Sequence, residues 1–300
     1  MLAKVVIFGV GLIGGSFALA LRQAGAAASI VGMGRSPQAL ERALELGIID
    51  SIGSSVRDAM RGASLALVAA PVAQTEAILA SLLPYLEEGT VLTDAGSTKS
   101  DVVAAARRAL GQRAAQFVPD HPIAGRESNG PDAALADLYR GKKVVLTPLP
   151  ENSAADVHRV AQAWRACGAI VHQLTAAQHD MVFAAVSHLP HLLAFGLVDD
   201  IARKPHADLL FQYAASGFRD FTRIAASSPE MWRDISLANR DALLGELDAY
   251  LAQLTGMRAS LAASDGAALE AVYANAQRAR RQWSGAIESA EAPRAPDTAE

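Results

Sequence analysis

The stretch that decides the fold is "KVVIFGVGLIGG", residues 4–15. It begins with a short apolar run rich in β-branched side chains, which is typical of a buried strand. The glycine pattern G-x-G-x-x-G follows at once and leads into the helical pattern "IGGSFALALRQAG". Between a strand and a helix, such glycines allow a tight turn, close approach of the backbone to a pyrophosphate, and close packing of helix on strand. We therefore predict a dinucleotide site with these cofactor-binding residues: Gly9, Gly11, Leu12, Ile13 and Gly14. The alternative is a glycine-rich turn that serves packing alone.

Strands and helices alternate from that turn onward. Short apolar runs occur at residues 29–35, 64–71, 90–97, 115–125, 142–150 and 169–174, and helical patterns lie between most of them. Ser36 and Pro37 begin one of these helices by the capping rules, and Gly47 lies just past its end. We predict an α/β fold in which residues 1–174 form a Rossmann-like domain around a doubly wound, mostly parallel sheet.

Strand patterns stop after Leu174, and the second half of the chain is helical. A long helical pattern at residues 175–204 is interrupted by Pro190, and further helices are predicted at roughly 207–226, 229–256 and 264–286. We expect residues 175–286 to form an all-helical C-terminal domain. Residues 287–300 are rich in proline and acidic side chains and lack periodicity, so we predict a disordered tail.

Composition excludes several classes of protein. Hydrophobic residues make up 51% of the 300 residues and charged residues 19%, which is enough apolar material for about two packed domains. The net charge of −4 lacks the basic excess of a nucleic-acid binder. A single cysteine, Cys167, fits a reducing compartment. The N-terminus lacks the pattern of a signal peptide, and we expect no uncharged apolar stretch long enough to cross a membrane. We predict a cytoplasmic protein that binds neither nucleic acid nor membrane.

The end of the second predicted strand bears on which dinucleotide binds. Sites for NAD usually have Asp or Glu there to hold the ribose 2′-hydroxyl, whereas this chain has Gly34, Arg35 and Ser36. Arg35 can pair with a 2′-phosphate and Ser36 can donate a hydrogen bond, so we favour NADP over NAD. The alternative is that Arg35 is a solvated surface side chain. Ala70 and Pro71, which end the apolar run at residues 64–71, complete the predicted cofactor-binding set.

Two loops at predicted strand ends carry candidate catalytic groups. "DAGSTKSD", residues 94–101, contains Ser97, which can donate to a substrate oxygen or a catalytic base. Its alternative role is the N-cap of the following helix, with Lys99 on the surface. "HPIAGRESNG", residues 121–130, holds His121 and Glu127 close together in a loop stiffened by proline and glycine. A lone histidine is usually structural, but this one follows a strand and faces the same crevice as Ser97, so we predict that it is catalytic.

Two helical stretches carry candidate substrate-binding groups. In "SHLPH", Ser187 and His191 are four residues apart and share a helix face, while Pro190 removes a backbone donor and should kink or loosen the helix. We regard His188 as structural. In "GFRDFTRIA", Arg223 suggests a carboxylate clamp, since the planar guanidinium can form two parallel bonds. The alternatives are a polar helix surface for "SHLPH" and an internal salt bridge for the arginine, to Asp220 or Asp234.

These four stretches, in this order after a G-x-G-x-x-G pattern, resemble one family, the prephenate and arogenate dehydrogenases of tyrosine biosynthesis. The resemblance covers roughly residues 3–285, and "HPIAGRE", "SHLPH" and "GFRDFTRIA" are its specific parts. It implies a Rossmann-like domain joined to a helical domain that binds substrate and forms a homodimer. It also implies oxidation of a cyclohexadienol ring by NAD or NADP with loss of CO₂, and no metal.

The same resemblance assigns roles to residues. It implies that His121 is catalytic, that Ser97 assists it, that Arg223 binds the substrate carboxylate, and that the pocket is lined by Glu127, Ser187 and His191. Arg35 departs from many members that use NAD. The sequence leaves prephenate and arogenate open as substrates. Two other functions remain as alternatives: another β-hydroxyacid-type dehydrogenase with Lys99 as the proton-transfer group, and an NADP-sensing protein without catalysis.

Overall fold

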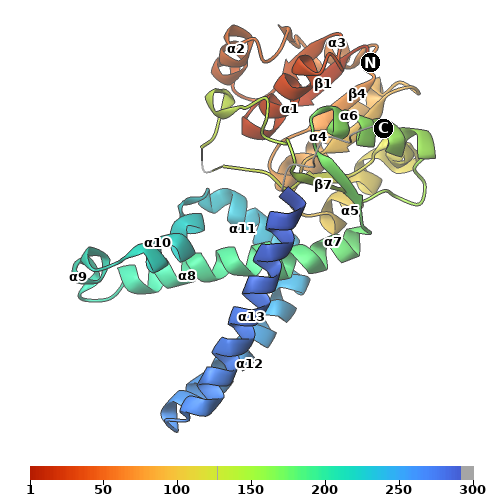
Figure 1. The fold of residues 1–300 in the computed structure, drawn as a ribbon. Helices are drawn as coiled ribbons and strands as arrows, with labels where there is room; N and C mark the ends of the chain where they lie inside the picture. The colour runs from red at the N-terminus through yellow and green to blue at the C-terminus, as the bar shows by residue number, and fades with distance from the viewer. Residues whose placement is uncertain (127, 292–300) are drawn as a thin grey trace, which may run out of the picture. The chain divides into compact units, whose positions relative to one another are not determined.

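The protein is built on a five-stranded parallel sheet (Figure 1). The structure, a computed structural model, describes residues 1–126 and 128–291, of which residues 285–291 are described as backbone alone. The strands lie in the order β3-β2-β1-β4-β5. Their bounds are β1 Val5–Phe8, β2 Ile30–Met33, β3 Ser51–Ile52, β4 Leu65–Val68 and β5 Val91–Asp94. Val5 of the central strand β1 pairs with Ile30 on one side and with Leu65 on the other, all in parallel register.

Both faces of this sheet are buried, as the predicted doubly wound fold requires. Val5 and Ile7 belong to one hydrophobic cluster, which includes Trp164, whereas Val6 and Phe8 belong to a second cluster on the other face. Successive strand residues point to opposite faces, so an all-apolar strand needs cover on each side. The covering helices are α1 Leu12–Gln23, α2 Pro37–Glu45, α3 Val56–Met60, α4 Thr75–Leu82 and α5 Ser100–Leu110, with the short turns η1 Val72–Gln74, η2 Leu83–Tyr85 and η3 Gly111–Gln116.

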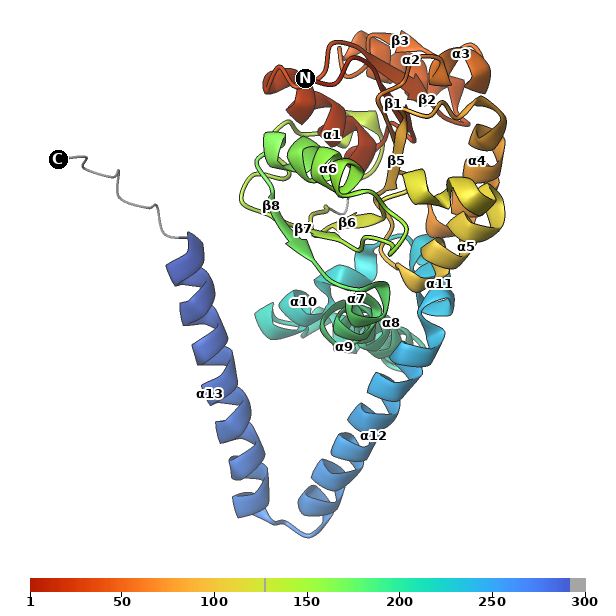
Figure 2. The ribbon, with the colours of Figure 1, turned by 90° about the vertical axis from the view of Figure 1, so that its right-hand side faces the viewer.

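The last three strands differ from the prediction, because they form a second sheet in which one strand is antiparallel. The sheet consists of β6 Asp120–Pro122, β7 Lys143–Leu146 and β8 Ile170–Gln173 (Figure 2). β6 runs antiparallel to β7, and among the described residues between them the one helical element is the short turn η4 (Pro131–Ala133). β7 and β8 are joined by α6 (Ala154–Ala166) and are parallel. Parallel neighbours need a crossover, usually a helix, and the segment before β7 lacks one.

The C-terminal half is helical, as predicted, but its helices break at different places. The elements are α7 Ala176–Phe183, η5 Ala184–His188, α8 Leu189–Ala202, α9 Ala207–Gln212, α10 Ser216–Thr222, η6 Arg223–Ala226, α11 Pro229–Ala238, α12 Arg240–Ala262 and α13 Gly266–Glu291. The predicted helix 207–226 is two helices followed by a 3-10 turn. The predicted helix 229–256 is interrupted at Asn239, a buried residue whose side chain is used in tertiary contacts. Helix α13 also covers residues 287–291 of the predicted tail, and residues 292–300 lie outside the described residues.

Pro190 loosens its helix as predicted. The backbone is π-helical over Ala184–His188, directly before the proline, and α-helical again from Leu189. A π-turn is a recognised cause of a local irregularity in a helix and is frequent at functional sites. By length and composition alone, the continuous stretch Ala176–Ala202 is long and apolar enough to cross a membrane, with 28% of its most apolar window buried. The expectation that no such stretch exists was therefore wrong.

The chain divides into two compact units, residues 1–243 and 244–300. The first contains both sheets and the helices through α11. The second contains most of α12 and the described part of α13. The division of the sequence at residue 174 into two domains stays a prediction.

Candidate active site

The glycine turn between β1 and α1 has the shape that a dinucleotide requires. A Cβ atom at Gly9 would lie 2.3 Å from the carbonyl oxygen of Ala69, and one at Gly14 would lie 2.1 Å from that of Gly9. These two positions are therefore fixed by packing. In contrast, no described atom lies within 4 Å of a Cβ built at Gly11, so the turn is open where a ligand would approach. Among the described side chains, none caps the N-terminus of α1, and its first turn contains no acidic residue.

These features fit a pyrophosphate. Uncapped amide groups at a helix N-terminus, with the positive end of the helix dipole, form an anion site. The turn lies between β1 and β4, where the strand order reverses and open α/β sheets bind ligands. The backbone nitrogen of Ala70 is 3.4 Å from the Cβ position of Gly9, which places this predicted residue beside the turn. Leu12 is buried, and the Ile13 carbonyl accepts a hydrogen bond from the Tyr139 hydroxyl.

The residues predicted to choose between cofactors lie at the end of β2. Arg35 is exposed, as is Pro71 at the end of β4. Ser36 is the N-cap of α2, as predicted, because its hydroxyl oxygen accepts a hydrogen bond from the Ala39 amide at 3.2 Å. The same hydroxyl lies 3.2 Å from the Gln38 side-chain oxygen, to which it can donate.

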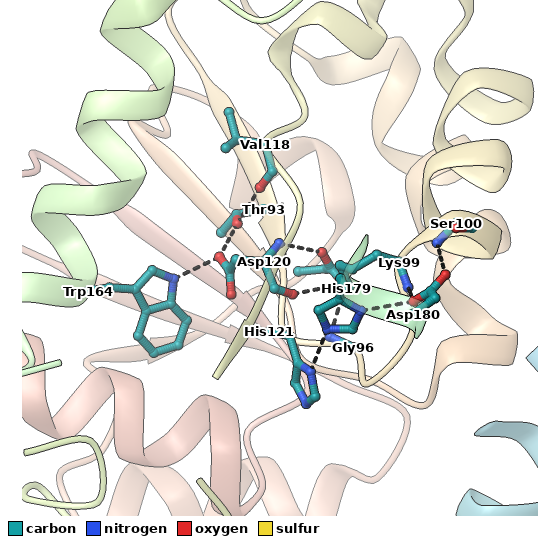
Figure 3. Close-up of polar contacts among 11 residues, drawn as sticks. Thr93, Gly96, Lys99, Ser100, Val118, Asp120, His121, Trp164, His179 and Asp180 are labelled. Carbon is teal, nitrogen blue, oxygen red and sulfur yellow. Dashed lines mark hydrogen bonds and ion pairs between the residues drawn. The ribbon is translucent and has the colours of Figure 1, made fainter. Parts of the chain in front are cut away.

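Lys99 is the most deeply enclosed charge near the carboxyl end of β5 (Figure 3). Its side chain has no exposed surface, which corrects the expectation that it lies on the surface. Its Nζ atom lies 2.5 Å from Asp94 Oδ2 and donates to the backbone carbonyl of Asp120 at 2.6 Å. A buried ammonium needs such a partner, since an unpaired buried charge is very costly.

Asp120 is a buried carboxyl group of this network whose surroundings favour the protonated form. Burial raises the pKa of its carboxyl group well above the usual value, and the neighbouring charge of Asp94 raises it further. The carboxyl Oδ2 contacts the Thr93 hydroxyl at 2.5 Å and accepts from the indole nitrogen of Trp164 at 2.7 Å. The Thr93 hydroxyl also lies 2.7 Å from the Val118 carbonyl oxygen, to which it can donate its only proton. A protonated Asp120 satisfies both contacts of Thr93, because it can donate to the hydroxyl oxygen.

His121, the predicted catalytic histidine, lies in β6 and follows Asp120 directly. Its Nδ1 atom is 2.9 Å from Nε2 of His179, and His179 Nδ1 is 2.8 Å from Oδ1 of Asp180 (Figure 3). Burial lowers the pKa of His121 well below the usual 6.5, and it is lowered further by His179, Lys99 and His188, each of which repels a second positive charge when it is protonated. His121 is therefore neutral at pH 7 and has the protonation state of a general base.

His188, which we regarded as structural, lies beside the predicted serine. It is almost fully buried, and its Nδ1 accepts a hydrogen bond from the Asn239 side-chain amide at 3.0 Å. It also donates to the backbone of Ser97. Burial lowers the pKa of His188 to about 4, so it is neutral. Ser97 itself is half-buried and does not cap α5, because the N-cap residue of that helix is Lys99.

The predicted substrate-binding residues lie along α8, η6 and α11. The Nδ1 atom of His191 donates to the Ser187 backbone carbonyl at 2.8 Å, and the imidazole stacks on the indole of Trp232 with ring centroids 3.5 Å apart. Burial lowers the pKa of His191, and the hydrogen bond to the Ser187 carbonyl opposes this shift. The positive charge of Arg223 lowers the pKa further, and the net shift is downward. Arg223 therefore lies close enough to His191 for their charges to interact. Asp234, one of the two acidic residues named as an alternative partner of Arg223, forms an ion pair with Arg233 at 2.6 Å.

Electrostatic interactions join these groups into one site. Protonation of His188 would lower the pKa of His121, protonation of His191 would lower that of His188, and the guanidinium of Arg223 lowers that of His191. A cavity of about 500 Å³ opens at the Arg223 end and does not include His121 or Ser97 among the described residues that line it. Its lining residues are Ala214, Ala215, Phe218, Arg219, Thr222, Arg223 and Ala226. Glu127 lies outside the described residues.

Comparison with known proteins identifies the family. Residues 17–173 match the family described as "Prephenate dehydrogenase, nucleotide-binding domain", and residues 175–274 match "Prephenate dehydrogenase, dimerization domain". The chain belongs to the prephenate dehydrogenase family. It is an NAD(P)-dependent oxidoreductase of tyrosine biosynthesis, as the sequence predicted. Among the described residues, no cluster of three or more histidine, cysteine or acidic side chains could hold a metal ion.

Full-length relatives support membership of this prephenate dehydrogenase family. A cyclohexadienyl dehydrogenase of Zymomonas mobilis is 35% identical over 279 residues, which cover 92% of this chain and 94% of that protein. The crystal structure of prephenate dehydrogenase from A. aeolicus in complex with hydroxyphenyl propionate and NAD⁺ is 35% identical, with a TM-score of 0.88, and the match covers 94% of this chain and 98% of that one. The Synechocystis arogenate dehydrogenase structure is 26% identical, with a TM-score of 0.79 over 93% and 99% of the two chains.

Within this prephenate dehydrogenase, sequence reasoning missed two residues that contact the predicted catalytic residues, His179 and His188. It also missed the buried position of Lys99, which contacts Asp94 and the Asp120 carbonyl. Lys99 was assigned to the surface, or to catalysis only in the alternative β-hydroxyacid-type dehydrogenase. That alternative and the non-catalytic NADP sensor are both set aside, because the family matches span both halves of the chain. The one local signal for His179 was its neighbour Asp180, and an adjacent His-Asp pair does not by itself indicate a site.

Proposed function

We propose that this prephenate dehydrogenase uses His121 as its general base, with Ser97 beside it and Arg223 as the clamp for a substrate carboxylate. The observation that carries the proposal is the neutral imidazole of His121, which lies in β6 directly after Asp120 and contacts the buried His179 at 2.9 Å. A dinucleotide bound at the glycine turn would supply the hydride acceptor. The residues of the chain then have to bind, orient and deprotonate the substrate.

His121 accepts the proton of the ring hydroxyl at C4 as the hydride leaves that carbon. The dienone that develops expels CO₂ because the ring becomes aromatic. Ser97, whose backbone accepts a hydrogen bond from His188, would hydrogen-bond the same hydroxyl oxygen or the imidazole. Arg223 orients the ring by holding its carboxylate, which makes the reaction effectively intramolecular. We assign Ser187, His191 and Glu127 to the wall of the substrate pocket.

Kinetics of two variants test these roles. His121→Asn should lower kcat by about 10²–10⁴-fold with a modest change in KM, because it removes the base. Arg223→Ala should mainly raise KM. In the wild type, kcat/KM should stay level as the pH falls through 6.5, the ordinary histidine pKa, because burial keeps His121 unprotonated well below it. Near-normal turnover by His121→Asn at every pH would refute the assignment.

The cofactor preference is a finer proposal. We infer that NADP is favoured, because the end of β2 offers exposed Arg35 and no carboxylate to hold a ribose 2′-hydroxyl. The A. aeolicus relative is described with NAD⁺, so NAD use by this chain is the competing outcome.

The choice between prephenate and arogenate is also open to experiment. The two substrates differ by a keto and an amino group on the side chain. Relatives are described as prephenate, arogenate and cyclohexadienyl dehydrogenases. We propose prephenate as the substrate, in keeping with the two family descriptions. Steady-state kinetics with both substrates, each measured with NAD⁺ and NADP⁺, will decide this and the cofactor preference together.

We further propose that the protein is a cytoplasmic homodimer that associates through its helical domain. The match of residues 175–274 to a dimerization domain supports this, as do the many exposed apolar side chains on the helices from α7 onward. A dimer interface would also bury apolar surface of the stretch Ala176–Ala202. The apolar character of that stretch is then explained without a membrane. The buried free thiol of Cys167 fits a reducing compartment.

A further inference from the structure

We propose that His179 and Asp180 form a relay with His121 that fixes which ring nitrogen of His121 is the base. In this relay His179 is a positioning residue, and the base is Nε2 of His121. The inference rests on the proposed role of His121. It follows from three hydrogen-bonded steps, each of which leaves a single choice of donor and acceptor.

The first step fixes Asp180 as an ionised acceptor. Its Oδ1 accepts from the Lys99 backbone amide at 2.8 Å, and its Oδ2 accepts from the Ser100 amide at 2.7 Å. These amides belong to the N-cap residue and the first residue of α5, and a backbone amide can only donate. Burial would raise the pKa of Asp180, but the hydrogen bonds from His179, Ser100 and Lys99 lower it, and the net pKa lies below the usual value. Asp180 is therefore a carboxylate locked in place by a helix end.

The second step fixes the tautomer of His179. Its Nδ1 lies 2.8 Å from Asp180 Oδ1, and an ionised carboxylate can only accept, so Nδ1 carries the proton. Burial lowers the pKa of His179 despite the opposing hydrogen bond to Asp180, so the ring is neutral. A neutral imidazole with a proton on Nδ1 has a lone pair on Nε2. His179 is fully buried and has no alternative contact with water.

The third step fixes the tautomer of His121. The lone pair of His179 Nε2 lies 2.9 Å from His121 Nδ1, which must therefore be the donor. Because His121 is neutral too, its lone pair is on Nε2, the ring nitrogen that the relay leaves unused. The relay thus holds the imidazole in one tautomer and one orientation before substrate binds. An unrestrained histidine would divide its population between two tautomers, of which only one has a lone pair on Nε2.

The charged groups around the relay support neutrality of both rings. Burial lowers the pKa of both histidines and Lys99 lowers it further, whereas Asp180 and Asp94 raise that of His179 without reversing the shift. The relay also couples two distant segments, because Asp180 of α7 caps α5, which lies 80 residues earlier in the chain. His121 therefore has its base nitrogen defined only while α7 is docked on the N-terminus of α5.

¹⁵N NMR of the histidine rings tests the tautomer directly. In wild-type protein labelled at its seven histidines, the signals of His121 should show a protonated Nδ1 and an unprotonated Nε2. Their absence from the spectrum of His121→Asn assigns them. A wild-type His121 that is protonated on Nε2 overturns the proposal without any further variant. The result is independent of whether other substitutions at the site fold.

Two variants of His179 separate positioning from packing. His179→Leu removes the acceptor at similar volume and should lower kcat by about 10–100-fold, the usual loss for a supporting hydrogen-bond partner, with little change in KM. His121 should then show both tautomers. His179→Gln keeps a side-chain acceptor and should restore much of kcat. If His179→Leu retains wild-type kcat and a single His121 tautomer, or if His179→Gln is no better while folding equally well, the relay is refuted.

The experiment also distinguishes the failure of the relay from the failure of the proposed base. If His121→Asn is nearly inactive while the wild-type tautomer is the opposite one, only the relay is wrong. If His121→Asn turns over normally, the assignment of the base is wrong. A loss of kcat in His179→Leu would then refute the relay as well, because His179 would be acting through a group other than His121.

Discussion

At the scale of single residues, the chemistry of the site depends on what each side chain touches. Lys99 follows a threonine and precedes a helix, a context typical of a surface lysine, yet its ammonium group is enclosed beside Asp94 and lowers the pKa of His121. His121 was predicted to be catalytic from its motif, in which proline and glycine follow it. Lys99, His179 and His188 were not, because their partners lie up to 81 residues away in sequence and meet them only in the fold.

Arg35 provides a prediction at this scale. Arg35→Asp should weaken NADP⁺ binding by at least about tenfold, or about 1.4 kcal/mol, and weaken NAD⁺ binding far less, because only NADP⁺ carries the 2′-phosphate that a guanidinium can hold. Isothermal titration calorimetry with each cofactor measures both affinities. Arg165→Asp on α6 is the matched control, since it is also exposed and makes the same change in charge. Equal losses of affinity for the two cofactors would show that Arg35 does not bind the 2′-phosphate of NADP⁺.

At the scale of secondary-structure elements, the sequence predicted whether a segment is a helix or a strand better than it predicted where helices end or in which direction a strand runs. The β1–α1 turn, the N-cap at Ser36 and the irregularity at Pro190 follow local rules and were found as predicted. The break at Asn239 was not predictable, because it depends on hydrogen bonds from its amide to Asp180 and His188. The reversed strand β6 was missed for a similar reason. An apolar run predicts a strand, but only the connection that follows decides its direction.

The glycine turn gives a prediction at the scale of an element. Gly14→Ala should lower the free energy of unfolding by about 1–3 kcal/mol, because the new methyl group would collide with the Gly9 carbonyl oxygen and with Ile7 and push α1 off β1. Gly11→Ala should leave the thermal midpoint nearly unchanged and instead weaken cofactor binding, because its methyl group occupies the open side of the turn. Thermal unfolding and calorimetric titration of both variants measure the contrast. If Gly11→Ala bound both cofactors as the wild type does, the pyrophosphate would not lie at this turn.

At the scale of the whole molecule, the unit at residues 244–300 has no core among its described side chains. None of its described side chains, residues 244–284, is buried, although Leu254, Leu261 and Trp283 are large and apolar. Two helices with no buried apolar face are not stable alone, because most helical stability comes from packing. A second copy of the chain would supply the missing cover. This was only partly readable from sequence, since helical periodicity shows that an apolar face exists but not which surface covers it.

Helix α12 supplies the test of that dimer. Its large apolar side chains recur every three or four residues, at Leu243, Leu247, Tyr250, Leu254, Met257 and Leu261. The wild type should therefore elute in light-scattering chromatography with twice the chain mass of 31.3 kDa. Leu254→Asp places a charge in the stripe and should shift the equilibrium to monomer at micromolar concentration, because a buried unpaired charge costs several kcal/mol. Ala252→Asp is the matched control, since two residues along a helix are about 200° apart and the same charge then faces away from the stripe. A monomeric wild type, or equal dissociation of both variants, would mean that this stripe is not the interface and that the apolar surface of α12 is covered in some other way.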